Sequence, residues 1–264
     1  MRKKMKRILT SLTIILFFSQ FLDAQIDRMR FGVSAGPGIA WAKPFGVDLQ
    51  KGKIRASADY GFMFEYWFTK NIGINSGLNG SFDGMNIKDR NYFELDSAQI
   101  QVRNVNEKYT FNYLQLPAYI KFKSNEIKDS RFSVWGQLGF ALNFTVNART
   151  TFSSPVPRQP VISSPLDLVT VEKENILRKD NEAAKSISGF KSNFFDFRLG
   201  VGSGFEYRFD DKNSLLVGLF YHNGFVNNLI DRDPKKEPIV MRTMSLRVGV
   251  LFWCLFKFYL WKLL

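Results

Sequence analysis

The chain has 264 residues, and its 37 basic and 24 acidic residues give it a formal net charge of +13. Aromatic residues make up 16% of the chain, including 27 Phe, yet the mean hydropathy of -0.15 is that of a water-soluble protein. The single cysteine, Cys254, excludes an intramolecular disulfide, and one Cys with one His cannot form a usual structural zinc site.

The N-terminus has the pattern of a secretory signal peptide. Five basic residues precede an apolar run from Ile8 to Leu22, and Ala24 offers a small residue for cleavage. We predict a signal peptide over residues 1–24, with an uncleaved inner-membrane anchor as the alternative. Cleavage leaves 32 basic and 23 acidic residues, a net charge of +9. Because an exported protein does not meet the genome, this charge points to anionic lipid, lipopolysaccharide or an acidic protein as partner, not to nucleic acid.

Three predicted strands follow, over residues 30–36, 58–68 and 72–82. In each strand large apolar side chains alternate with Gly, Ser, Asn or charged ones, so one face is apolar and the other polar. The pattern is strongest in 58–68, where Asp59 and Glu65 share the polar face. The apolar face of that strand carries Tyr60, Phe62, Phe64, Tyr66 and Phe68.

The fourth and fifth predicted strands, 109–123 and 131–146, keep this alternation. Lys121 and Lys123 fall on the polar face of the fourth strand. Pro117 lies in the same strand, and because proline has no amide hydrogen we expect a bulge or an irregular pairing there. Trp135 is the one bulky residue on the polar face of the fifth strand.

The sixth predicted strand, 195–209, has the most regular pattern in the chain. Its even positions are all charged or glycine, and its odd positions, apart from Ser203, are all large and apolar. The strand is longer than the roughly five to six residues of an average globular strand and satisfies the about nine to eleven that cross a bilayer. Length and polarity together predict a membrane barrel.

Two more predicted strands, 214–222 and 242–252, complete a set of eight. The seventh strand is more mixed and places Leu216, Phe220 and His222 on its inward face. The eighth strand has Arg247 on its polar face and ends at Phe252. An even number of strands is what single-chain bacterial barrels require.

The connections are short after the second, fourth and sixth strands and long after the others, the longest over 147–192. Short periplasmic turns and long extracellular loops alternate in this way in up-and-down barrels, with both termini in the periplasm. Eleven tilted residues span roughly 25 Å, the height of the apolar band. We therefore predict an all-β fold over residues 25–252, an eight-stranded antiparallel up-and-down transmembrane β-barrel with long extracellular loops, in the outer membrane.

The alternative fold is a periplasmic lipocalin-like barrel, which would turn its apolar face inward around a ligand. Since charges would then fill the outer surface and aromatics the interior, the two folds differ in which face is buried. An eight-stranded barrel is just wide enough for side chains to fill it, so we expect the inward charges to pair and to close the lumen. The candidates are Asp59, Glu65, Lys121, Lys123, Asp196, Arg198, Glu206, Arg208 and Arg247.

The sequence predicts no catalytic, cofactor or metal site, and hence no enzyme. His222 is the only histidine, and neither Ser214 nor Tyr221 forms an evident triad with it. The run from Gly200 to Gly204 lacks the spacing and the following helix of a nucleotide-binding loop. We interpret the glycines of this run as inward residues that leave space for arginine side chains in a crowded lumen.

An aromatic extension, residues 253–264, follows the last strand. We expect Phe252 to be the terminal residue that the barrel assembly machinery recognises, so that deletion of 253–264 leaves assembly intact. The extension could prolong the strand, lie at the periplasmic interface, or reflect an altered gene end. A transmembrane helix over 248–264 is a further alternative, which would consume the last strand.

Three segments carry a resemblance to a known family: 113–122 (YLQLPAYIKF), the pair Ala24-Gln25, and 245–252 (SLRVGVLF). In these the chain resembles the PorT-like outer-membrane β-barrels of Bacteroidota. The resemblance implies a non-enzymatic outer-membrane protein that works with other secretion or cell-envelope proteins in type IX secretion and gliding, and it carries over no catalytic residue. A surface adhesion barrel and a narrow solute channel are the alternatives.

Overall fold

The computed structural model describes residues 28–45, 49–95, 99–128, 130–156, 167–175, 190–231 and 238–253. The predicted signal peptide and residues 254–264 of the predicted extension lie outside these ranges. Among the described residues no helix is both long enough and apolar enough to cross a membrane.

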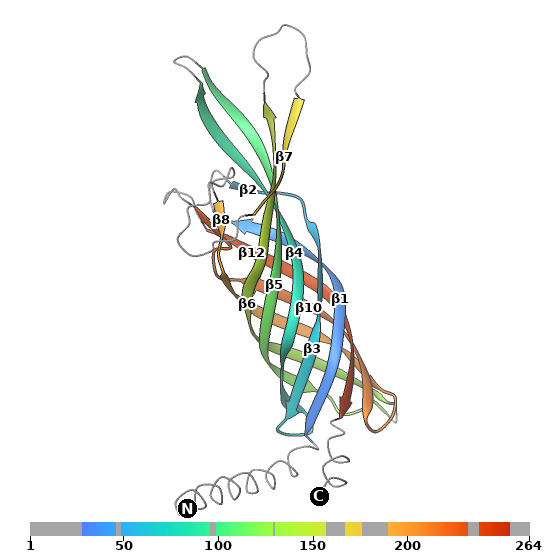
Figure 1. The fold of residues 1–264 in the computed structure, drawn as a ribbon. Coiled ribbons are helices and arrows are strands. Elements are labelled where there is room, and N and C mark those ends of the chain that lie inside the picture. The colour runs from blue at the N-terminus through green and yellow to red at the C-terminus, as the bar shows by residue number, and fades with distance from the viewer. Residues whose placement is uncertain are drawn as a thin grey trace, which may run out of the picture.

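Eight antiparallel strands close into a barrel (Figure 1). The circle closes where the first and last of them pair, from Arg30↔Trp253 to Pro44↔Ile239. The predicted eight-stranded antiparallel barrel is thereby confirmed. Its strands are β1 (Met29–Pro44), β3 (Arg55–Trp67), β4 (Ile72–Leu95), β5 (Gln99–Lys123), β6 (Phe132–Val156), β9 (Phe195–Arg208), β10 (Asn213–Gly224) and β12 (Ile239–Trp253).

Four short strands lie outside the barrel wall. β2 (Leu49–Lys51) pairs with β4, and β7 (Asp167–Asn175) pairs with β6. β8 (Phe190–Ser192) and β11 (Leu229–Asp231) form a separate two-stranded sheet. All four lie toward the end of the barrel opposite the start of β1 and the end of β12, which we call the hairpin end; the other is the termini end (Figure 1).

The two faces of the wall are those that the alternation predicted. Phe62 and Phe205, which point outward, are 67% and 60% exposed, whereas the inward Glu65 and Lys121 are fully buried. A lipocalin-like barrel with its aromatics inside is therefore excluded. An exposed apolar belt of this kind is the surface that a bilayer covers.

Several strands are longer than the sequence predicted. β1 continues to Pro44 rather than ending at residue 36, and β4 and β5 pair as far as Leu95↔Gln99. Residues 83–95 and 99–108 of the connection expected between them are therefore strand, and so are residues 147–156 and 167–175 of the longest expected loop. The period-two pattern fails there because strands beyond the membrane have no lipid on either face, so the contrast between faces disappears.

The irregular pairing expected at Pro117 is present on one side only. On β6, Pro117 pairs with Ala141 in unbroken register, whereas on β4 the pairing skips Gly77 and Leu78 and resumes without a shift. The Ser76 hydroxyl donates a hydrogen bond of 2.8 Å to the Pro117 carbonyl in this gap. The bulge itself lies elsewhere, between the pairs of Asn112 and Tyr113.

The turn between β9 and β10 is closed by Asp210. Its carboxylate accepts hydrogen bonds from the Asn213 side chain at 2.9 Å and from the amides of Lys212 and Asn213 at 2.7 Å each. These hydrogen bonds, that of the Asn213 side chain first, hold the pKa of Asp210 below its ordinary value of 3.8. The tight turn places the ends of both strands side by side.

Candidate functional site: the filled lumen and the projecting sheet

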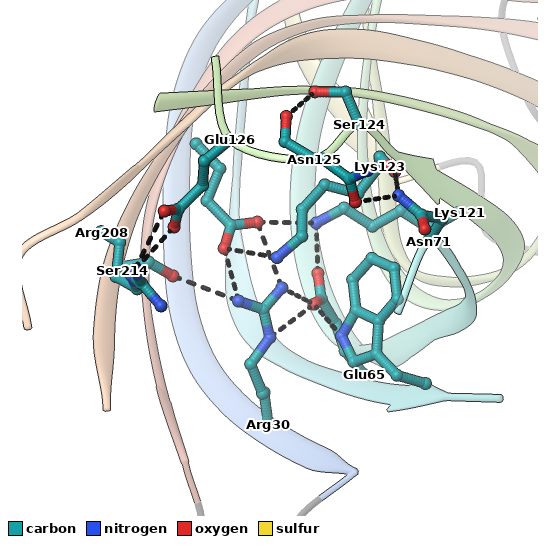
Figure 2. Close-up of polar contacts among 12 residues, drawn as sticks. Arg30, Glu65, Asn71, Lys121, Lys123, Ser124, Asn125, Glu126, Arg208 and Ser214 are labelled. Carbon is teal, nitrogen blue, oxygen red and sulfur yellow. Dashed lines mark hydrogen bonds and ion pairs between the residues drawn. The ribbon is translucent and has the colours of Figure 1, made fainter. Parts of the chain in front are cut away.

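Five charged side chains form a network in the lumen at the termini end (Figure 2). Arg30 lies between two carboxylates: its Nη2 is 2.5 Å from Glu65, and its Nη1 pairs with Glu206. Lys121 also pairs with Glu65, and it lies 3.8 Å from Glu206. Lys123, the one partly exposed member, is 3.3 Å from Glu206. We call these five residues the termini-side network, and they carry three positive and two negative charges.

Tryptophan rings surround this network. The Arg30 guanidinium lies 5.2 Å from the ring centroid of Trp67 and 5.7 Å from that of Trp253, and Lys121 Nζ lies 5.0 Å from that of Trp135. Trp67 also donates a hydrogen bond of 3.2 Å from its Nε1 to Glu65. Because cations bind favourably over aromatic faces, the rings compensate part of the hydration that the cations lose.

A second set of five charges, the central network, lies further along the lumen. Arg247 Nε is 2.7 Å from Asp59, while Arg198 bridges two carboxylates, Asp83 at 2.7 Å and Asp196 at 2.6 Å. All five side chains are buried. With two positive and three negative charges, the central network offsets the surplus of the termini-side network. The ten charged groups of the two networks therefore sum to zero.

An apolar layer separates the two networks. Trp135 and Phe220 pack with ring centroids 5.4 Å apart. Lys121 of the termini-side network contacts Trp135, and Arg247 of the central network lies 4.2 Å from the centroid of Phe220. The layer consists of Met63, Trp135, Leu216, Phe220 and Leu251. Gly218 makes room for it, since a Cβ on Gly218 would lie 2.2 Å from Trp135.

The hairpin end of the lumen is closed by a larger apolar cluster. The Tyr113 ring of this cluster lies 4.7 Å from the Arg198 guanidinium, so the cluster rests directly on the central network. Its members are Ala42, Met85, Ile87, Tyr109, Phe111, Tyr113, Ala148, Leu229, Ile239 and Met241. Beside Asp59, Asp83 and Arg198 lies a cavity of about 10 Å³, room for roughly one water molecule. Within the described residues, side chains thus fill the lumen.

The structure places most, but not all, of the predicted ion-pair residues in the lumen. Eight of the nine lie in the two networks, but the prediction is wrong for Arg208, which is 45% exposed and pairs at 3.0 Å with Glu126 in the turn after β5. Arg208 has inward parity, yet it is the last residue of β9 and reaches solvent. Sequence reasoning missed Arg30 and Asp83. Arg30 had the inward parity that could have identified it, whereas Asp83 followed the predicted end of its strand.

His222 is buried inside the lumen and both its ring nitrogens have partners. Nε2 lies 2.8 Å from the Tyr119 hydroxyl and Nδ1 lies 3.4 Å from the Thr243 hydroxyl. This geometry places no nucleophile beside a free ring nitrogen. No group of three or more potential metal ligands occurs in the part of the chain that is described. The expectation that the protein is not an enzyme stays a prediction.

Two β-hairpins project from the barrel at the hairpin end and diverge toward their tips (Figure 1). They consist of the outer parts of β4 and β5 and of β6 with β7, and because they are paired at their base we call them the projecting sheet. β5 and β6 stay paired up to Asn106↔Ser153, and β7 joins the far side of β6 from Arg149↔Asn175 to Val156↔Asp167. Since β4, β5 and β6 are also strands of the wall, the sheet has no hinge segment between it and the barrel.

The chain is similar to several known outer-membrane proteins. A family model described as "Outer membrane protein beta-barrel domain" matches residues 18–231. The solved structure of Neisserial surface protein A (NspA) is 12% identical and covers 85% of this chain and 97% of its own, with a TM-score of 0.38. Outer membrane protein OprG from Pseudomonas aeruginosa is 13% identical, with coverage of 86% and 98% and a TM-score of 0.37.

The attachment invasion locus protein Ail of Yersinia pestis is 16% identical and covers 84% of this chain and 98% of its own, with a TM-score of 0.33. The comparison with curated proteins gives no match.

Proposed function

Because the chain belongs to the family of outer membrane protein beta-barrel domains, we propose that its barrel is the membrane anchor of a binding surface, the projecting sheet. The observation that carries this proposal is the shared strands: β4 and β5 pair from Ile72↔Phe122 in the wall to Leu95↔Gln99 at the tip. A two-stranded hairpin alone is marginally stable in water. A hairpin that continues a closed wall is held in place by it and can present a fixed surface to a protein partner.

The filled lumen supports binding over conduction. Its ten network charges are paired, apolar clusters lie between and above them, and the cavity beside Arg198 has room for roughly one water. A narrow solute channel would need these pairs to separate, and breaking a buried ion pair costs about 3–5 kcal/mol. In planar bilayers the purified protein should therefore give no large and stable conductance. A large and stable conductance would instead support the solute channel.

Within this role we propose a part in type IX secretion and gliding, with other secretion or cell-envelope proteins as partners. The support is the resemblance of residues 113–122 and 245–252 to PorT-like barrels of Bacteroidota. Both segments belong to the wall, on β5 and β12, whereas the proposed binding surface is the projecting sheet. By the usual orientation of such barrels, the sheet faces the outside of the cell and both termini face the periplasm.

The test is a chain in which residues 89–105 are replaced by a two-residue Asn-Gly turn. Lys88 and Asn106 are register partners, so the shortened hairpin can close at that pair. We expect the barrel to assemble and secreted cargo to accumulate in the periplasm, as in a strain that lacks the gene. Normal secretion with altered surface attachment would favour the adhesion barrel. Normal secretion and normal attachment together would contradict the proposed role of the sheet.

A further inference from the structure

The outward face of the wall changes from apolar to basic at the hairpin end. Toward the hairpin end, the successive outward residues of β1 are Ile39, Trp41 and Lys43. Those of β12 are Met244 and then Arg242. The outward positions of β4, β5 and β6 likewise reach exposed Lys88, Lys108 and Arg149. Arg242 and Trp253 are eleven positions apart, which for a tilted strand is roughly 25 Å, the height of an apolar band. The change therefore falls at the expected membrane boundary.

Two of these cations, Lys43 and Arg242, gather with Lys51 around one tryptophan. Trp41 and Arg242 are register partners on neighbouring strands, and Lys43 follows Trp41 on the same face. Lys51, on β2, lies with its Nζ 5.6 Å from the Trp41 ring centroid. The Tyr221 ring lies 6.3 Å from that of Trp41. Trp and Tyr side chains of this kind favour the level of the lipid head groups.

Local contacts hold two of these cations in position. Arg242 donates a hydrogen bond of 2.8 Å from Nε to the Asn223 side-chain oxygen, and neither of its terminal nitrogens has a partner among the described residues. Lys43 Nζ lies 4.5 Å from the ring centroid of Phe45. We call Lys43, Lys51 and Arg242 the rim cluster. A guanidinium fixed at Nε can present its other two nitrogens to a phosphate.

No acidic residue in the described part of the chain pairs with the rim cluster. The acidic side chains described at this end, Asp83, Glu107 and Asp196, are all buried. At the termini end, by contrast, exposed Glu126, Asp210 and Asp211 accompany the exposed cations. Among the described residues the rim cluster therefore has no anionic partner, and its charge is available to a ligand.

We propose that the rim cluster binds the phosphate groups of lipid A, the membrane-embedded part of lipopolysaccharide in the outer leaflet. The apolar wall directly below the cluster can contact the acyl chains, while the three cations meet the phosphates at the head-group level. An acidic protein would be recognised by charge alone and would gain nothing from a site that borders the lipid belt. The positive charge of the rim cluster, its aromatic neighbours and its height at the membrane boundary all fit lipid A better than an acidic protein.

The experiment titrates bisphosphorylated lipid A into the full-length barrel in mild detergent, with native mass spectrometry to count bound molecules. The test variant carries Lys43→Gln, Lys51→Gln and Arg242→Gln. The matched control carries Arg28→Gln, Lys70→Gln and Lys212→Gln, which remove an equal number of positive charges, three, from the termini end. Each basic residue at an anionic membrane strengthens binding about fivefold, so the test variant should bind on the order of 100-fold more weakly. The control should bind within a few fold of the parent.

Phosphate recognition also predicts that removing the phosphates from lipid A weakens its binding to the parent. The loss should be about as large as that caused by the three substitutions. Added salt should weaken the binding of intact lipid A to the parent. Equal affinity of parent and test variant for intact lipid A would overturn the proposal. So would equal binding of intact and dephosphorylated lipid A to the parent. All six substitutions are at exposed or half-buried positions outside the lumen, and heat-modifiable gel mobility verifies that each variant has folded.

Discussion

Glu65 is the carboxylate on which the termini-side network depends most. It contacts Arg30 twice, through Nε at 3.1 Å and Nη2 at 2.5 Å, pairs with Lys121, and accepts a hydrogen bond from Trp67. Glu65→Gln keeps the shape and most hydrogen-bonding capacity of the side chain but removes its charge. Glu206 would then be the only carboxylate of the network for three cations, and the net charge of the network would rise from +1 to +2.

We expect this substitution to lower the free energy of unfolding by about 3–5 kcal/mol, the usual cost of leaving a buried charge without its partner. The matched control is Glu126→Gln, because Glu126 also pairs with an arginine but its side chain is 39% exposed. An exposed pair contributes about 0–1 kcal/mol. The difference between the two variants therefore measures burial and not the chemistry of the substitution.

The assay is equilibrium urea unfolding of the barrel in phospholipid vesicles, followed by tryptophan fluorescence and by heat-modifiable gel mobility. Addition of Lys121→Met to Glu65→Gln returns the network to +1, so the double variant should be more stable than Glu65→Gln alone. Equal losses for Glu65→Gln and Glu126→Gln, or no recovery in the double variant, would refute the claim that paired charges hold the lumen together.

Gly218→Ala places a Cβ 2.2 Å from the Trp135 ring and should cost about 1–3 kcal/mol in urea unfolding, whereas Gly136→Ala, with its nearest atom at 3.9 Å, should be tolerated; equal costs would contradict the packing argument. The carboxylate of Asp210 has a lowered pKa, so the stability that it contributes is present above pH 3.8 and is lost as the pH falls through that lowered value. The urea midpoints of the parent and of Asp210→Ala should therefore converge at acid pH, and a gap that widens there would have the wrong sign. Deletion of residues 254–264 leaves β12 whole and should preserve heat-modifiable mobility; its loss would show that the assembly signal lies beyond the strand.

The predicted extension begins one residue too early. Trp253 is the last residue of β12, pairs with Arg30, and donates its amide to the Lys212 carbonyl. The strand assignment also excludes a transmembrane helix that begins at residue 248. The sequence could not locate this boundary because an aromatic residue at the membrane interface fits the end of a strand and the start of an extension equally well.

Sequence alone determined the fold class and the face on which most residues of the eight predicted strands lie. The two faces of a strand alternate with a period of two, which is local geometry, and the lipid belt makes that period visible. The period alone therefore assigns Asp59, Glu65 and Lys121 to the lumen, and Phe62 and Phe205 to the membrane. The eight strands and their antiparallel order followed from the same period and from the connections.

Only the tertiary structure decided which charges meet. Parity assigns a face but no height, and the height of a residue in a tilted, staggered barrel depends on the register of every pair around the circle. Arg30 thus meets Glu206, which lies 176 positions away in the sequence, while Arg208, with the same parity as Glu206, lies outside the lumen. The rim cluster has the same origin, because β1, β2 and β12 come together at Trp41 only when the sheet closes.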